Sequence, residues 1–149
     1  MENAFRPAHR SLADRLAEIV AQSHRDFVHA GSEVVFAFTY YGHRAKLRLI
    51  GEEKFLEPLN RAALEIAKAV AAEAEGEPSL VVGNICNTNL DDPGDEESWA
   101  EARTMFDEQV GWAAEVGVDF IVAETFNYLG EALLALDAVR AAGLPAAVT

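Results

Sequence analysis

Short, uninterrupted apolar runs alternate with amphipathic helical segments along this 149-residue chain. The run Val34–Thr39 contains β-branched and aromatic residues without polar alternation, which is typical of a strand buried on both faces. Similar strands are expected at 80–83, 118–123 and 145–149, and helices at 11–30, 60–74, 95–116 and 129–142. Strands that alternate with helices of this length predict right-handed βαβ units and a parallel sheet.

A parallel α/β sheet of this kind belongs either to an open doubly wound fold or to a closed (β/α)8 TIM barrel. No GxGxxG string follows an expected strand, and no GxxxxGK[ST] string occurs. The usual phosphate-binding signatures of open sheets are therefore absent, which favours the barrel and leaves the open sheet as the alternative.

The linker Asn87–Ser98 contains the acidic run Asp-Asp-Pro-Gly-Asp-Glu-Glu at residues 91–97. This composition predicts a solvated loop that leads into a helix, and acidic residues favour a helix N-terminus. A metal site is the less favoured interpretation of the run, because it lacks the spacing of a calcium-binding loop.

Acidic residues outnumber basic ones by 25 to 12, which gives a net charge of −13. Such a surface repels phosphate groups, so neither nucleic acid nor an anionic membrane is expected as a partner. No apolar stretch approaches the ~20 residues of a membrane span, and the first residues do not resemble a signal peptide. The single cysteine, Cys86, excludes an internal disulfide framework, and we expect a cytoplasmic location.

Ligands of parallel α/β folds bind at the carboxyl ends of the strands, so the residues that follow each strand are the candidates for function. Glu124 ends an apolar strand, where it could hold an ammonium group or act as a general base. Capping the next helix, or simple contact with water, is an equally open interpretation. Tyr41 could contact a substrate or a metal-bound group, although a packed ring is commoner. Cys86 is better explained as a small buried residue than as a nucleophile.

The four histidines do not form a metal-binding motif. His24 and His29 lie five positions apart on one expected helix and so do not share a face. His9 and His43 lie in other segments, and a zinc site built from histidines alone is not expected.

Two strings resemble the homocysteine S-methyltransferase family, particularly its betaine–homocysteine methyltransferase branch. Ala-Gly-Ser-Glu-Val-Val-Phe-Ala-Phe-Thr-Tyr-Tyr at 30–41 is similar to the family's second-strand region, which ends in a tyrosine near the active site. Val-Asp-Phe-Ile-Val-Ala-Glu-Thr-Phe at 118–126 resembles the family's VDFIIAET strand, and Glu131 follows at the familiar offset. The segments 59–63 and 143–145 also fit, so the resemblance extends from about Ser23 to Thr149.

The resemblance implies a barrel that moves a methyl group onto homocysteine, giving methionine, with zinc binding the homocysteine sulfur as a thiolate. By position, Glu124 matches the glutamate that holds the substrate's amino group, and Tyr41 matches the tyrosine near the metal. Thr125 occupies the next substrate-facing position, where betaine-type enzymes often have an aromatic residue. Thr39 is assigned to the same substrate-binding set.

The sequence departs from the family in two places. The family's zinc ligands are one cysteine late in the barrel and a pair in a Gly-Gly-Cys-Cys string, and Cys86 matches none of them. The family's opening strand, with its Asp-Gly-Gly string, has no counterpart in residues 1–10. A barrel needs ~250 residues, so residues 1–149 are expected to form a partial homocysteine-binding barrel domain of about four βα units. Zinc is expected in the complete enzyme, and none is expected on this chain.

A partial barrel leaves an unpaired sheet edge and an uncovered apolar face. We therefore expect the chain alone to fold marginally or to self-associate through the open edge, and not to catalyse. Its expected ligands are homocysteine and a small methyl donor, namely betaine, S-methylmethionine or a folate. The alternatives are a non-catalytic half-barrel binding module, and another α/β-barrel or open-sheet enzyme, such as a lyase, that uses Glu124 as a base.

Overall fold

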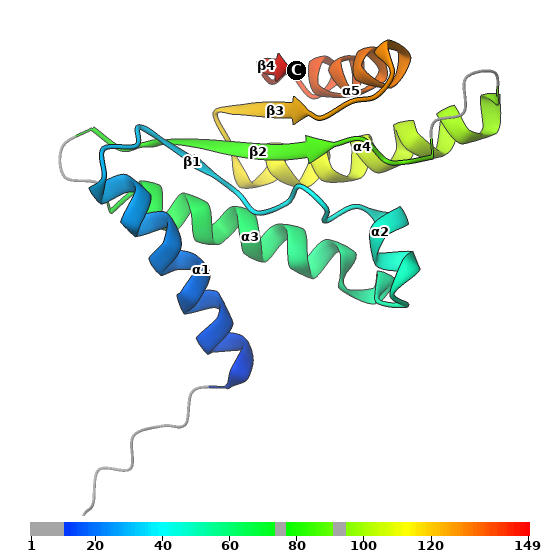
Figure 1. Cartoon of the computed structure of the whole chain (residues 1–149). Helices are drawn as coiled ribbons and strands as arrows, with labels where there is room; N and C mark the ends of the chain where they lie inside the picture. The colour runs from blue at the N-terminus through cyan, green and yellow to red at the C-terminus, as the bar shows by residue number, and fades with distance from the viewer. Residues whose placement is uncertain (1–10, 74–76, 91–94) are drawn as a thin grey trace, which may run out of the picture.

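The structure is a computed structural model that describes residues 11–73, 77–90 and 95–149. Helices and strands alternate along the chain, as the sequence predicts (Figure 1). In chain order the elements are α1 (Leu12–His29), β1 (Val34–Phe36), α2 (Arg44–Leu49), the short 3-10 helix η1 (Glu53–Phe55), α3 (Leu56–Ala71), β2 (Leu80–Cys86), α4 (Glu96–Val116), β3 (Phe120–Glu124), α5 (Leu129–Ala141) and β4 (Ala146–Val148).

The four strands form one parallel sheet in the order β1-β2-β3-β4, which confirms the predicted parallel α/β architecture. Val35 pairs with Val81, Cys86 pairs with Glu124, and Ala123 pairs with Val148. Because every crossover joins neighbouring strands in the same direction, β1 and β4 are the two edges of the sheet. This order is that of consecutive strands in a barrel rather than that of a doubly wound sheet, in which the order reverses at a switch point.

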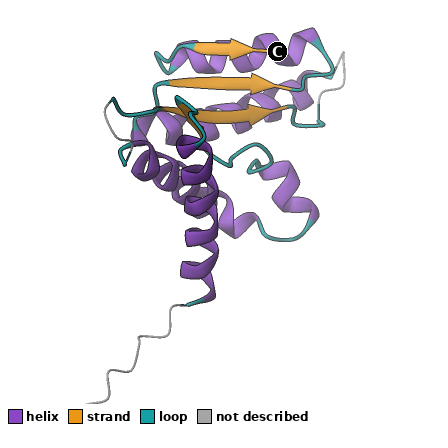
Figure 2. Ribbon diagram, turned by 60° about the vertical axis from the view of Figure 1, so that its left-hand side comes forward, coloured by secondary structure: helices purple, strands orange, loops and turns teal. Residues whose placement is uncertain are grey.

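Helices cover one face of the sheet, and the strands lie in front of them in Figure 2. The apolar core fills the space between the two layers. Alternate strand residues such as Val35, Ile85 and Ile121 point into it, where they meet Leu64 of α3 and Phe106 of α4. The intervening strand residues point to the opposite face, which in a closed barrel is the interior.

Local signals account for the helix ends. Ser11 caps α1: its hydroxyl accepts from the Asp14 N–H at 3.1 Å, and the Asp14 carboxylate accepts from the Ser11 N–H at 2.9 Å. These two hydrogen bonds form a capping box. Helix α4 ends at Gly117, whose φ of 83° is the left-handed conformation that favours glycine at a helix C-terminus.

The structure corrects several predicted boundaries. β1 ends at Phe36 rather than at residue 39, because Gly42 N–H donates to the Thr39 carbonyl and turns the chain. β2 continues to Cys86, so Asn84 lies inside the strand and not after it. Helix α3 begins at Leu56, four residues before the predicted start at Asn60, because Pro58 sits in its first turn, where no backbone donor is needed.

Helix α2 was absent from the sequence-based expectations. Its six residues carry no long apolar period, and ion pairs to α4 hold it in place. Arg44 contacts Glu108, and Arg48 contacts Glu101 at 2.9 Å. Two further expectations fall outside the described residues. They are the lack of an Asp-Gly-Gly counterpart in residues 1–10 and the form of the acidic loop at 91–94.

Within the described ranges, no helix combines the length and the apolar character that crossing a bilayer requires.

Candidate functional site

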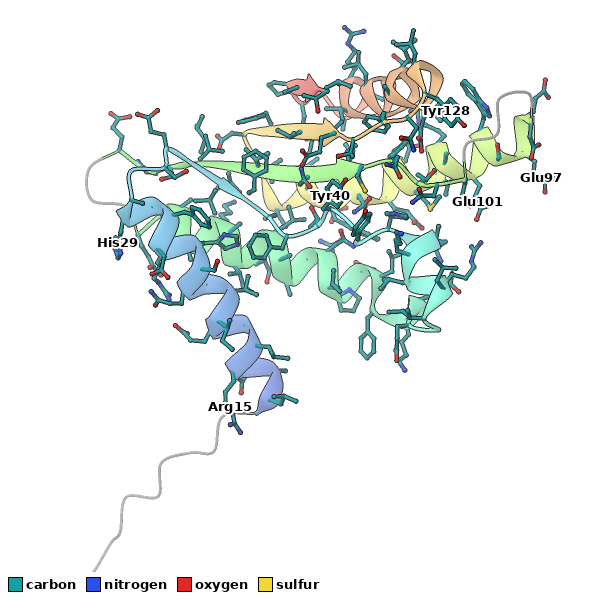
Figure 3. The ribbon with its side chains drawn as sticks, in the orientation of Figure 1. Arg15, His29, Tyr40, Glu97, Glu101 and Tyr128 are labelled. Carbon is teal, nitrogen blue, oxygen red and sulfur yellow. The ribbon has the colours of Figure 1, made fainter. Side chains whose placement is uncertain are left out.

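The polar residues singled out at the strand ends gather at the carboxyl edge of β1, β2 and β3. The register places Cys86 beside Glu124, and the Cys86 thiol donates to the Tyr40 carbonyl at 2.8 Å. Figure 3 labels Tyr40, which follows β1 at this edge. Residues from three separate segments of the sequence therefore meet where parallel α/β folds bind ligands.

Glu124 is half-buried, and its carboxylate is held by a neighbouring strand. Asn84 Nδ2 donates to Glu124 Oε1 at 2.7 Å. Asn84 pairs with Val122, and Glu124 lies two residues after Val122 on the same strand. Because side chains two residues apart on a strand share a face, Asn84 and Glu124 both point to the inner face of the sheet. Glu124 does not cap α5, whose N-cap is Tyr128. The carboxylate is thus fixed at Oε1, and among the described residues no hydrogen bond is made to Oε2.

Thr39 ties the end of β1 to β2. Its hydroxyl donates to the Asn84 carbonyl at 2.6 Å and accepts from the Asn84 N–H at 3.1 Å. Thr39 is buried, and these two bonds use its hydroxyl within the protein. Thr39 therefore positions Asn84, which in turn positions the Glu124 carboxylate. Direct contact of Thr39 with a substrate stays a prediction.

Two buried amides, which the sequence analysis did not single out, hold the turn after β1. Gln109 of α4 donates to the Thr39 carbonyl at 2.9 Å and to Asn60 Oδ1 at 3.1 Å. Asn60 of α3 donates in turn to the Gly42 carbonyl at 2.6 Å. A Cβ at Gly42 would lie 3.1 Å from Asn60 Oδ1 and from the Thr39 carbonyl oxygen, so a side chain there would crowd the turn. Polar residues at core-facing positions of apolar helices were the signal that could have revealed these amides.

Tyr41 lies at the outer side of this turn, and its ring is more exposed than packed. Its edge meets the Tyr40 ring, with 4.5 Å between centroids, and Lys46 Nζ lies 4.6 Å from the centroid of the Tyr41 ring. The commoner packed-ring interpretation of Tyr41 is therefore wrong. The phenol and an ammonium group stand at the same edge of the sheet as Glu124.

Thr125 has a φ of 66°, a left-handed conformation that a β-branched residue seldom adopts. Asn87 Nδ2 donates to the Thr125 carbonyl, and the Thr125 side chain shares a hydrogen bond with Tyr40. Such strain persists where the surroundings over-determine it, and it concentrates at functional sites. The strained residue comes directly after Glu124 in the sequence.

Glu131 is a buried carboxylate in the first turn of α5. Its Oε1 accepts from the Thr88 N–H at 2.6 Å and from the Thr88 hydroxyl at 2.7 Å. This contact fixes the loop after β2 to the start of α5. Glu131, which follows the third strand at the spacing that resembles the family's, therefore has a structural role.

The described residues do not fit the zinc ion that the family resemblance implies. In residues 11–73, 77–90 and 95–149, no group of three or more His, Cys, Asp or Glu side chains could hold a metal ion. Burial raises the pKa of the Cys86 thiol to about 12, and nearby Glu131 acts in the same direction. A cysteine binds a metal as its thiolate, and Cys86 is a protonated, buried thiol at neutral pH.

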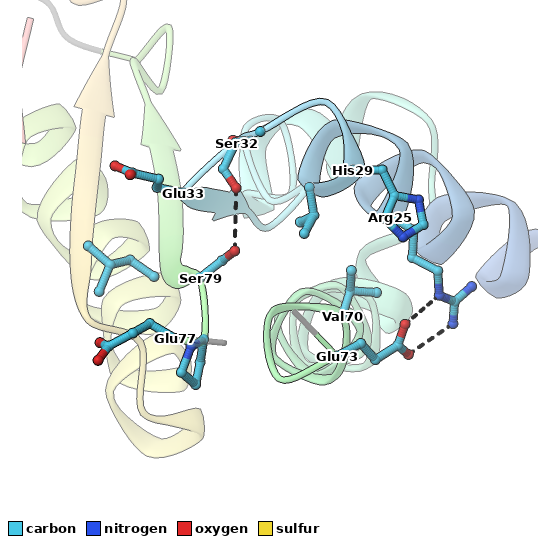
Figure 4. A pocket seen from close by; sticks show the side chains of 12 residues that line it. Arg25, His29, Ser32, Glu33, Val70, Glu73, Glu77 and Ser79 are labelled. Carbon is cyan, nitrogen blue, oxygen red and sulfur yellow. Dashed lines mark hydrogen bonds and ion pairs between the residues drawn. The ribbon is translucent and has the colours of Figure 1, made fainter. Parts of the chain in front are cut away.

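A cavity of about 720 Å³ lies at the opposite, amino end of the sheet (Figure 4). Arg25 of α1 and Glu73 line it and form a two-bond ion pair at 2.6 and 3.1 Å, and Ser79 faces Ser32 across it. In barrel enzymes the amino ends of the strands serve stability, and chemistry takes place at the carboxyl ends. This cavity is therefore not the candidate site.

A parallel sheet with strands in consecutive order, helices on one face and polar residues at the carboxyl edge defines the chain as part of a (β/α)-barrel. The homocysteine S-methyltransferase family model matches residues 2–149, and the chain belongs to this family. It is 35% identical over 138 residues to betaine–homocysteine S-methyltransferase 1 of Bos taurus, covering 89% of this chain and 32% of that protein. It is also 35% identical over 130 residues to the S-methylmethionine–homocysteine S-methyltransferase BHMT2 of Rattus norvegicus, covering 87% of this chain and 33% of that protein.

The fold agrees with a solved relative. The oxidized form of the homocysteine methyltransferase MmuM from Escherichia coli superposes with a TM-score of 0.74 at 18% identity, over 95% of this chain and 56% of that one. A metallated form of the same protein gives a TM-score of 0.71. The chain spans about a third of the length of both curated relatives above and just over half of MmuM. The partial barrel predicted from the sequence is confirmed.

Proposed function

We propose that this chain forms the amino-acid-binding part of a methyltransferase that carries a methyl group from a small donor to homocysteine, giving methionine. In that reaction the sulfur of homocysteine bonds to the methyl carbon, the donor's bond to this carbon breaks, and the thiol proton is lost. The observation that carries the proposal is Glu124, a half-buried strand-end carboxylate held at one oxygen by Asn84.

Glu124 would accept a hydrogen bond from the ammonium group of homocysteine. An ion pair of this kind is stronger at a partly desolvated sheet edge than in open water. Because Asn84 and the Thr39 bridge fix the carboxylate before the substrate arrives, little side-chain freedom is lost on binding. Tyr41 and Thr125, which lie at the same edge, would line the space beside the bound amino acid.

Methyl transfer is proposed for the complete barrel and not for this chain alone. The family resemblance implies a zinc ion at the homocysteine sulfur, and the described residues supply no ligand set for it. The names of the relatives make betaine and S-methylmethionine the proposed donors, and the cytoplasmic location stays a prediction from the sequence.

Binding of L-homocysteine to the purified chain, measured by isothermal titration calorimetry, tests the role of Glu124. Glu124→Gln keeps the size of the side chain and removes its charge, and we expect it to weaken binding about tenfold or more, because a hydrogen bond to a charged group contributes ~1.5–3 kcal/mol. 4-Mercaptobutyrate, which lacks the amino group, should bind the wild type as weakly as homocysteine binds the variant.

Glu65→Gln is the matched control, since Glu65 is an exposed carboxylate on α3. It should leave the affinity unchanged. Equal affinity of the wild type for homocysteine and 4-mercaptobutyrate would contradict the proposed role and would favour a different barrel chemistry for Glu124.

A further inference from the structure

A glutamine lies on the apolar face of α4, the face that packs against the sheet. Gln109 is 4% exposed, and the buried core residues Phe106 and Ala113 lie one turn before and after it on the same face. An apolar side chain of similar size, such as that of methionine, would fill this volume without requiring hydrogen-bond partners. The groups that the buried amide contacts therefore indicate what it does.

The amide nitrogen of Gln109 makes two hydrogen bonds. Nε2 donates to the Thr39 carbonyl at 2.9 Å and to Asn60 Oδ1 at 3.1 Å. Asn60 Nδ2 donates in turn to the Gly42 carbonyl at 2.6 Å. Because a carbonyl oxygen can only accept, these partners fix which end of each amide carries the nitrogen. The two amides therefore hold the first and the last residue of the turn after β1 in one defined geometry.

Further hydrogen bonds lead from Thr39 to Glu124. The Thr39 hydroxyl donates to the Asn84 carbonyl at 2.6 Å and accepts from the Asn84 N–H at 3.1 Å. Asn84 Nδ2 donates to Glu124 Oε1 at 2.7 Å. An unbroken series of hydrogen bonds thus joins Gln109 on α4, the turn after β1, strand β2 and the carboxylate at the end of β3. We call this series, which consists of Gln109, Thr39, Asn84 and Glu124, the relay.

The relay lies inside the protein up to its last member. Gln109, Thr39 and Asn84 are 3–4% exposed, and Glu124 is half-buried. Hydrogen bonds are stronger in this environment than in water, and a buried group that loses its partner cannot replace it with solvent. A change at one member is therefore expected to disturb the next one, so the orientation of Glu124 depends on a residue of the helix layer.

We propose that Gln109 is a positioning residue of the candidate site, which orients the Glu124 carboxylate through Thr39 and Asn84 for the ammonium group of the amino acid. The inference rests on the proposed function of Glu124. Gln109 belongs to the helix layer, whereas Glu124 points to the other face of the sheet, so Gln109 acts without touching the ligand. It limits the orientations that the carboxylate samples before binding, and this lowers the entropy lost when the ligand binds.

The side-chain amide resonances of Asn84, measured by NMR on the purified ¹⁵N-labelled chain, test the relay without any ligand. Their loss in Asn84→Asp identifies them. Glu124→Gln replaces the charged acceptor with a neutral one and should move the donated hydrogen upfield. Gln109→Met removes both bonds of the amide at similar volume, and Thr39→Val removes the hydroxyl. Each should move the Asn84 resonances in the same direction as Glu124→Gln does.

Isothermal titration calorimetry with L-homocysteine measures the consequence for binding. Gln109→Met and Thr39→Val should each raise the Kd about three- to tenfold, because the carboxylate must then be ordered during binding. Since both substitutions act through one series of bonds, the double variant should bind no more weakly than Thr39→Val alone. Effects that multiply in the double variant would contradict the relay. Gln109→Asn keeps the amide and shortens its reach, and it should show the same changes if Gln109→Met does not fold.

Val139→Ala is the control, since Val139 is a fully buried core residue of α5 outside the relay. It should lower the free energy of unfolding, as Gln109→Met does, and leave the Asn84 resonances and the homocysteine affinity unchanged. Asn84 resonances that stay in place in Gln109→Met, or that move as far in Val139→Ala, would overturn the proposal. If Glu124→Gln leaves the homocysteine affinity unchanged, the proposed function of Glu124 fails, and the resonances still decide whether Gln109 positions its carboxylate.

Discussion

His43 lies in the turn after β1, almost fully buried, and neither ring nitrogen has a hydrogen-bond partner among the described residues. Burial lowers its pKa to about 4, and the nearby ammonium of Lys46 acts in the same direction. The sequence placed His43 outside any metal motif, and its burial could not be inferred because it depends on helices distant in the sequence. Asn60 and Gln109, on two of those helices, hold the turn that contains it.

This burial makes stability depend on pH. Between the ordinary pKa of 6.5 and the folded value of about 4, the unfolded chain takes up a proton at residue 43 that the folded chain does not. The free energy of unfolding should therefore fall as the pH is lowered through this window, by about 1–3 kcal/mol from His43, and this contribution should be constant above pH 6.5. Urea denaturation at several pH values measures the slope.

His43→Met should flatten that slope, whereas His29→Met, at an exposed position on α1, should not change it. The lowered pKa of His24, which also arises from burial, adds a dependence of the same sign that remains in both variants. An unchanged slope in His43→Met would show that His43 is protonated in the folded state.

At the scale of elements, β2 shows that the apolar pattern predicts the presence of a strand but not where the strand ends. The apolar run at 80–83 predicted a short buried strand, and the structure extends it through Asn84 to Cys86. Polar Asn84 was placed after the strand because a buried amide requires partners that the sequence does not reveal. Those partners are Thr39 and Glu124, 45 and 40 residues away.

Gly83 in the middle of β2 allows α4 to approach the sheet. A Cβ at this position would lie 2.6 Å from Ile121 Cδ1 and 3.1 Å from Ala113 Cβ, in the fully packed core. Gly83→Ala should therefore lower the free energy of unfolding by about 1–3 kcal/mol. Urea titration of the purified variant measures this change.

Gly111→Ala on α4 is the matched control, because a Cβ there meets nothing within 4 Å. It should raise stability by roughly 0.5–1 kcal/mol through the better helix propensity of alanine. Equal effects of the two substitutions would show that the contact between α4 and β2 is looser than described.

At the scale of the whole molecule, the chain is a partial barrel whose proposed ligand site lies on an open edge. Its strand-end residues come from β1, β2 and β3, and its family relatives are two to three times as long. The described residues include the half-buried Glu124 carboxylate, which is proposed to hold an ammonium group, and no ligand set for a metal. Binding and catalysis are therefore expected to separate in this chain.

The purified chain, supplied with homocysteine, zinc and either betaine or S-methylmethionine, should form no methionine detectable by mass spectrometry. The physical reason is that no described group can hold the ion that would activate the sulfur, since the Cys86 thiol is buried and protonated. The MmuM enzyme, assayed in parallel with S-methylmethionine, is the control for the detection of methionine. Sustained methionine formation by this chain would contradict the expectation.

The sequence by itself determined the βα alternation, the helix cap at Ser11, the position of Glu124 at a strand end, and the family. These features depend on local periodicity, on short-range capping, or on strings of neighbouring residues, all of which are readable along one dimension. The tertiary structure decided the Asn84–Glu124 contact, the buried amides of Asn60 and Gln109, the strain at Thr125 and the exposure of apolar side chains on α1 and α5. Each of these depends on which distant segments the sheet brings together, and on which surfaces its four strands leave uncovered.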